Sequence, residues 1–118
     1  MSNKIYYLST CDTCKRIMKE INAKGNGFEL QDIKTEPITA AQLDALKAQT
    51  GSYQALFSKK SQQYKALGLG EQKLTEADYR KYILEHYTFL KRPVIQYDGK
   101  LYIGSEKKVV EDLIIDMM

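Results

Sequence analysis

The sequence predicts an α/β fold of one domain, residues 1–118, with an inserted helical segment from about residue 35 to 88. Three observations support this prediction. A strand-like run, a helical stripe and an alternating run follow one another near the N-terminus. An Asp-Gly pair lies between two β-rich runs near the C-terminus. The residues between these two regions show mainly helical patterns.

The N-terminal part has the order strand, helix, strand. Residues 4–8 form a short apolar run that is typical of a buried strand. A helical stripe with the spacing i, i+3, i+4, i+7 follows, at Cys14, Ile17, Met18 and Ile21. Glycines at 25 and 27 end that helix, and residues 28–33 alternate apolar and polar side chains. The order predicts a βαβ unit with parallel strands.

The middle of the chain shows helix starts and stops. Thr39 with Gln42 has the form of a capping box, and Gly51 breaks the helix that follows. Residues 53–67 have the pattern of short helical turns, and Thr75 opens another helix whose apolar stripe includes His86. We therefore interpret His86 as a capping or hydrogen-bonded core residue.

The C-terminal part predicts a hairpin and a last helix. Asp98-Gly99 joins residues 94–97 to residues 100–103, and a type I′ turn needs positive φ at both central positions. Ser105 is the expected cap of the last helix, with Glu106 in its first turn.

The charge composition gives little indication of the partner. The chain has 118 residues, and its 18 Lys and Arg nearly balance 15 Asp and Glu, so the net charge of +3 gives no reason to expect nucleic acid or a membrane surface as a partner. We find no secretory or transmembrane pattern. A reducing cytoplasm is the expected location, and a lone CxxC there favours catalysis or metal binding over a structural disulfide.

The thiol pair Cys11-x-x-Cys14 lies where a predicted strand ends and a helix starts. Unpaired N–H groups there favour a thiolate and lower its pKa. Lys15 and Arg16 add positive charge, and Asp12 opposes it. Cys11, at the loop edge, is the candidate nucleophile, and Cys14, one turn further in, is the candidate resolving thiol.

Two other interpretations of the pair are a zinc site and incidental core cysteines. A structural zinc site needs about four ligands, and two Cys and one His do not supply them, so no metal is expected. Incidental core cysteines are the other alternative, but a CxxC that opens a helix after the first strand predicts a thioredoxin-like fold. Pro93 is either a plain start to a strand or a cis proline beside the thiols.

Four segments together resemble the arsenate reductase (ArsC)/Spx family: residues 11–14, 58–61, 90–94 and 104–106. The resemblance covers nearly the whole chain. It implies a thioredoxin/glutaredoxin-like βαβ-ββα core with an inserted helical subdomain, and it favours a cis Pro93.

The reductase branch of this family implies a thiol-dependent oxidoreductase. In that branch a cysteine at the position of Cys11 attacks arsenate, and glutathione with glutaredoxin completes the reduction. The resemblance implies glutathione as a co-substrate, no bound cofactor, and glutaredoxin or thioredoxin as partner. It places Arg92, Pro93 and Lys60 at the oxyanion, but Lys60 replaces an arginine. A third arginine has no counterpart, because residues 103–104 are Ile-Gly. A lysine offers a point charge rather than a two-pronged fork, so the sequence predicts a weakened arsenate site.

The Spx branch implies a different function. Its members sense oxidants with a CxxC and bind the C-terminal domain of the RNA polymerase α subunit, and Gly51 falls near a glycine used in that contact. The third alternative is an unidentified small-thiol or persulfide role. We take the oxidoreductase as the first expectation and the redox-sensing regulator as the alternative.

Overall fold

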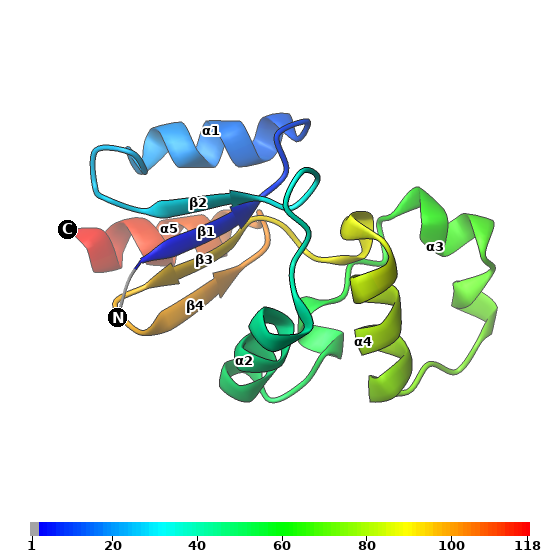
Figure 1. Cartoon of the computed structure of the whole chain (residues 1–118). Helices are drawn as coiled ribbons and strands as arrows, with labels where there is room; N and C mark the ends of the chain where they lie inside the picture. Colours follow the sequence, from blue (N-terminus) through cyan, green and yellow to red (C-terminus); the bar gives the residue numbers. More distant parts are fainter. Residues whose placement is uncertain (1–2) are drawn as a thin grey trace. The chain divides into compact units, whose positions relative to one another are not determined.

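The computed structural model describes residues 3–118. Figure 1 shows the whole chain, which divides into two compact units: Met1–Glu36 together with Arg92–Met118, and Pro37–Lys91. The elements of the first unit are β1 (Lys4–Tyr7), α1 (Asp12–Glu20), β2 (Glu29–Asp32), β3 (Val94–Tyr97), β4 (Lys100–Ile103) and α5 (Lys107–Met117). The expected helical insert, residues 35 to 88, has nearly the same bounds as the second unit, Pro37–Lys91. That the chain forms one domain stays a prediction.

The first unit has a four-stranded sheet in the order β2-β1-β3-β4. β1 pairs with β2 in parallel, and Ile5 lies opposite Leu30. β3 is antiparallel to both β1 and β4, and its Ile95 lies opposite Ile5 and Tyr102. The sheet therefore confirms the βαβ and ββα parts, and the fold is the thioredoxin-like one that the sequence predicts.

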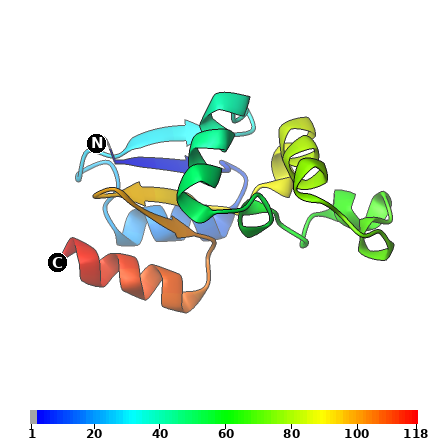
Figure 2. The same ribbon diagram turned by 90° about the horizontal axis from the view of Figure 1, so that it is seen from below.

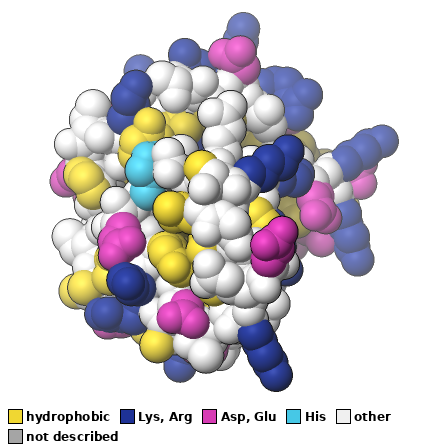
Figure 3. All heavy atoms as spheres, turned by 90° about the vertical axis from the view of Figure 1, so that its right-hand side faces the viewer, with side chains coloured by type: hydrophobic (Ala, Val, Ile, Leu, Met, Phe, Trp, Pro, Cys, Tyr) yellow, Lys and Arg dark blue, Asp and Glu magenta, His cyan; other side chains and the backbone are white. Residues whose placement is uncertain are grey.

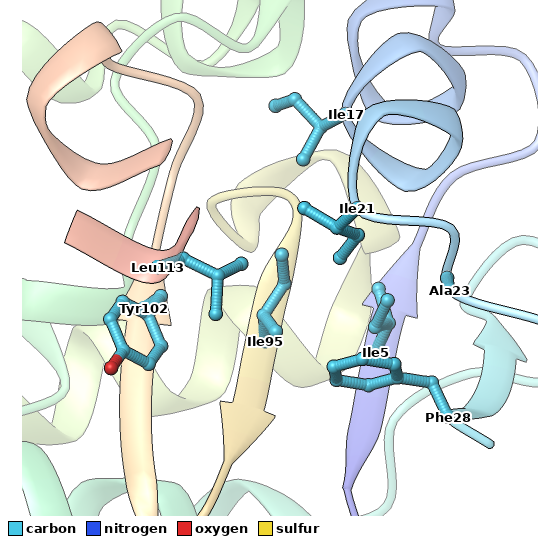
Figure 4. Close-up of a cluster of buried hydrophobic side chains, with 8 residues drawn as sticks. All are labelled: Ile5, Ile17, Ile21, Ala23, Phe28, Ile95, Tyr102 and Leu113. Atoms are coloured by element: carbon cyan, nitrogen blue, oxygen red, sulfur yellow. The ribbon is translucent and has the colours of Figure 1, made fainter. Parts of the chain in front are cut away.

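Helices α1 and α5 cover the same face of this sheet, as Figure 2 shows. The spacing of apolar residues gives each helix a single apolar face, which packs on the sheet. The core between helices and sheet contains Ile5, Ile17, Ile21, Ala23, Phe28, Ile95, Tyr102 and Leu113, which Figure 4 draws as sticks. Packing of α1 on β1 fixes where the chain turns from the strand into the helix.

The hairpin prediction is confirmed and the last cap is wrong. Asp98 has φ 50° and Gly99 has φ 79°, the positive pair that a type I′ turn needs. The cap of α5 is Glu106, not Ser105, and Glu106 makes no side-chain capping hydrogen bond. The reason lies at Gly104, whose φ of 89° and N–H bond to the Pro93 carbonyl keep the chain turning for one more residue.

The second unit contains α2 (Ala40–Thr50), η1 (Gln54–Leu56), α3 (Gln62–Ala66), η2 (Leu69–Glu71), α4 (Glu76–Glu85) and η3 (Tyr87–Phe89). Capping boxes at Thr39 and Thr75 start its two longest helices. The sequence predicts the box at Thr39 and, at Thr75, the start of the helix. Phe57 is central to the packing, since its ring lies 5.3 Å from that of Phe89 and 4.8 Å from that of Tyr79. The unit therefore has an aromatic core of its own.

His86 caps a helix, as expected. It ends α4 and begins η3, and its Nδ1 accepts the Thr88 N–H at 3.2 Å.

Figure 3 shows basic and acidic side chains interspersed on the face that lies at the right of Figure 1. Among residues 3–118, no helix has the length and apolar character needed to cross a membrane.

Candidate active site

The two cysteines lie at the start of α1. The N–H of Cys11 donates to the Leu8 carbonyl at 2.9 Å, which closes a turn directly after β1. Cys11 is the N-cap residue of α1, with extended φ and ψ of −98° and 109°. Its side chain is partly exposed, Cys14 is fully buried, and both are thiols. The positions are those predicted for a nucleophile and a resolving thiol.

The surroundings of Cys11 favour its thiolate. Partial burial raises the pKa of Cys11, but the amide and thiol of Cys14, the positive charge of Arg92 and the amide of Thr13 together lower it below its usual value. The amide groups at the start of α1 therefore stabilise a negative charge on the Cys11 sulfur. These surroundings favour Cys11 over Cys14 as the ionised thiol.

Cys14 has the opposite surroundings. Burial raises the pKa of Cys14 to about 12, and the neighbouring Cys11 raises it too, while the Leu8 amide and Arg92 act against the shift. A buried neutral thiol is a poor nucleophile. Its hydrogen bond to the Cys11 sulfur places it close enough to react when Cys11 forms a bond to another atom.

Arg92 and Pro93 lie beside these thiols. The Arg92–Pro93 peptide bond is cis, as the resemblance favours. Because Val94 pairs with Tyr6, Pro93 lies where β1 leads into the Leu8–Cys11 turn. Pro93 is buried, and the charge of Arg92 acts on both thiols. The fold therefore brings four of the five predicted site residues to one end of the sheet.

Lys60 belongs to the other unit. It is exposed, and its N–H donates to the Ser58 hydroxyl at 3.3 Å in the turn before α3. Its part in binding an oxyanion stays a prediction. At the third expected arginine position the first unit has Ile103, paired with Val94, and Gly104, whose N–H binds the Pro93 carbonyl. The backbone at this position is therefore engaged in pairing with residues 93–94, and neither residue there carries a positive charge.

The sequence did not single out Asp32. Its Oδ1 accepts the N–H of Ser9, at 3.3 Å, from within the Leu8–Cys11 turn. Ser9 follows β1 and Asp32 ends the adjacent parallel strand β2, but which residue of β2 lies beside Ser9 depends on the register of the two strands, which the sequence does not give. Among residues 3–118, no group of three or more His, Cys, Asp and Glu side chains is arranged to hold a metal ion.

Comparisons with known proteins identify relatives of this chain. The model of the ArsC family matches residues 6–113. An arsenate reductase of Acidiphilium multivorum is 29% identical over 118 residues, which cover 98% of this chain and 84% of that protein. An arsenate reductase of Escherichia coli K12 is 31% identical over 97 residues, 80% of this chain and 69% of that protein.

A solved structure shares the fold. The crystal structure of a possible arsenate reductase from Streptococcus mutans superposes with a TM-score of 0.75 at 24% identity, and covers 95% of this chain and 97% of its own. The match to the family model spans most of the chain and includes both cysteines, Arg92 and Pro93. This chain therefore belongs to the ArsC family.

Proposed function

We propose that this protein is a thiol-dependent oxidoreductase of the arsenate reductase type, in which Cys11 attacks the substrate and glutathione supplies reducing equivalents in the cytoplasm. The main support is the partly exposed Cys11 at the N-cap of α1, where amides and Arg92 lower its pKa. Family membership supports the same class of reaction.

The proposed reduction of arsenate takes two electrons, which two thiols supply as they form a disulfide. The Cys11 thiolate attacks arsenic(V), an oxygen leaves as water, and a sulfur–arsenic bond forms. A second thiol, of Cys14 or glutathione, then attacks the Cys11 sulfur. A disulfide forms, and arsenic leaves as arsenite with the bonding electron pair. Glutaredoxin or thioredoxin would return the disulfide to thiols.

Arg92 and Lys60 have distinct roles in this proposal. The guanidinium of Arg92, whose charge acts on Cys11, would stabilise the anionic group in contact with that sulfur. The exposed ammonium of Lys60 would add a second, weaker interaction with the oxyanion. Because lysine replaces an arginine and Ile-Gly stands at the third position, we expect weak binding of arsenate.

The test is turnover of arsenate with glutathione and glutaredoxin, followed by oxidation of NADPH through glutathione reductase. We expect slow but measurable turnover by the wild type and none above background by Cys11→Ser. Cys14→Ser separates the two resolving thiols, since it keeps turnover if glutathione attacks and loses it if Cys14 does. Wild-type protein without turnover excludes arsenate as substrate, and an active Cys11→Ser excludes the thiolate mechanism.

The redox-sensing alternative depends on the same thiol pair. Oxidation would join the sulfurs of Cys11 and Cys14 and change the start of α1, and the regulator would then bind the C-terminal domain of the RNA polymerase α subunit in one redox state. Gly51 ends α2 with φ 88°, and this conformation accounts for a glycine there without a partner. Capture of that domain by reduced or oxidised protein would favour the regulator, and no capture in either state excludes it.

A further inference from the structure

Three backbone N–H groups of the Leu8–Cys11 turn each have a different acceptor. The N–H of Cys11 closes the turn onto the Leu8 carbonyl at 2.9 Å. The N–H of Leu8 lies against the sulfur of Cys14 and opposes the rise in the pKa of that thiol. The N–H of Ser9, in the middle of the turn, donates to Asp32 Oδ1 at 3.3 Å.

Asp32 is itself held firmly at the end of β2. It lies opposite Tyr7 in the parallel pair, and the next residue extends the pairing, because the Ile33 N–H donates to the Tyr7 carbonyl at 2.9 Å. Oδ1 of Asp32 also accepts the Lys34 N–H at 3.1 Å, and its carbonyl accepts the Glu36 N–H at 2.8 Å. The carboxylate therefore has a fixed place beside the turn.

The Asp32 side chain is ionised at neutral pH. What little burial it has raises its pKa, but hydrogen bonds from the Ser9 side chain and from the Lys34 and Ser9 amides, with the charge of Lys34, lower the pKa below its usual range. Hydrogen bonds to a charged acceptor are stronger than neutral ones. The Ser9–Asp32 contact thus links two segments that are 23 residues apart in the sequence.

We propose that Asp32 is a positioning residue for the Cys11 nucleophile: its carboxylate holds Ser9, and through it the Leu8–Cys11 turn, in the conformation that keeps the Cys11 sulfur at the N-terminus of α1. Asp32 does not touch the reacting sulfur. The proposal rests on the proposed function, since it matters only where Cys11 reacts as a thiolate.

The experiment compares Asp32→Ala with Asp32→Asn in a Cys14→Ser background, where Cys11 is the one remaining cysteine. The thiolate is titrated by its ultraviolet absorbance, and its reactivity by the rate of alkylation with iodoacetamide at neutral pH. Asp32→Ala removes the acceptor, so we expect the titration to move to higher pH and alkylation to slow by about threefold. Asp32→Asn keeps an oxygen acceptor, so we expect values near the parent.

This pair of variants separates positioning from charge. If Asp32 acted through its negative charge alone, both variants would lower the pKa of Cys11 and speed alkylation, because a nearby carboxylate disfavours a thiolate. That outcome overturns the proposal. So does an Asp32→Ala protein that melts at a lower temperature while its titration and alkylation rate equal those of the parent.

The titration of Cys11 in the parent protein distinguishes failure of the proposed function from failure of the Asp32 proposal. A parent protein whose Cys11 titrates as an ordinary thiol contradicts that function and, with it, any positioning of a thiolate. A parent with a lowered titration that Asp32→Ala leaves unchanged contradicts the Asp32 proposal alone. Circular dichroism of each variant verifies that the fold is intact.

Discussion

Two cysteines three positions apart have opposite properties because of which side of a helix turn they occupy. Cys11 is outside the first turn of α1 and partly exposed, so its thiolate meets amides and the charge of Arg92. Cys14 is one turn further along and fully buried. The spacing alone predicted the two roles, but the contribution of Arg92, 81 positions after Cys11 in the sequence, needed the cis Arg92–Pro93 segment beside the turn.

Removal of the Arg92 charge tests this contribution. We expect Arg92→Gln to raise the pKa of Cys11 and to slow alkylation below that pKa by about threefold, and Arg92→Lys to cause a smaller change, because a lysine keeps the charge without the planar fork. Lys15→Gln is the matched control, since Lys15 is exposed and its charge is screened by solvent. The measurement is the pH dependence of the alkylation rate in the Cys14→Ser background. Identical profiles for Arg92→Gln and the parent contradict the assignment.

At the scale of the elements, local signals predicted the starts of α2 and α4 and the end of α2 correctly. The end of α1 was wrong, because α1 ends at Glu20 and a turn of seven residues, 21–27, carries the chain past the two glycines that were expected to end it. Thr39 with Gln42 and Thr75 with Asp78 form the reciprocal hydrogen bonds of a capping box. These signals are reliable because both partners lie within one turn of the chain. Ser105 misled the prediction of the last cap because the path of the chain there depends on Gly104 and the distant Pro93 carbonyl, which the local sequence does not contain.

Glycine substitutions test one helix end directly. Gly51 ends α2 with φ 88°, so Gly51→Ala is expected to lower the free energy of unfolding by about 1 kcal/mol even though no atom lies near the added methyl group. Gly70 is the matched control, because its φ is not positive and an added methyl group would meet Tyr64 at an ordinary 3.5 Å. Gly70→Ala is therefore expected to change that free energy by less than about 0.5 kcal/mol. Urea unfolding measures both, and equal losses would contradict the argument.

At the scale of the whole molecule, the order of the elements was enough to predict the fold. A parallel βαβ part and an antiparallel ββα part leave few ways to build one sheet, and the order β2-β1-β3-β4 is one of them. The contact between Ser9 and Asp32 was out of reach of the sequence, since it depends on the register that sets Tyr7 opposite Asp32. Lys60 illustrates another limit, because its predicted role needs two separate units to act on one ligand.

The buried thiol of Cys14 should make the stability of the protein fall at high pH. Its pKa rises on folding from 9.0 to about 12, so the folded state keeps its proton where the unfolded chain has lost it. The unfolded state then binds fewer protons, and the free energy of unfolding decreases as pH rises from 9 towards 12. Below pH 9 the contribution is fully present.

Cys11 and Tyr102 provide the controls for this prediction. The pKa of Cys11 is lowered on folding, so its contribution is present above pH 9.0 and is lost as pH falls through its folded pKa, the opposite window. Tyr102, whose pKa burial and Asp116 raise to about 12, adds a decrease between pH 10 and 12 that every cysteine variant retains. We therefore expect Cys14→Ser to flatten the loss of stability above pH 9 and Cys11→Ser to leave most of it in place. Urea unfolding of the reduced proteins over this range decides between them, because equal slopes for the two serine variants would mean that the Cys14 thiol does not remain protonated in the folded core.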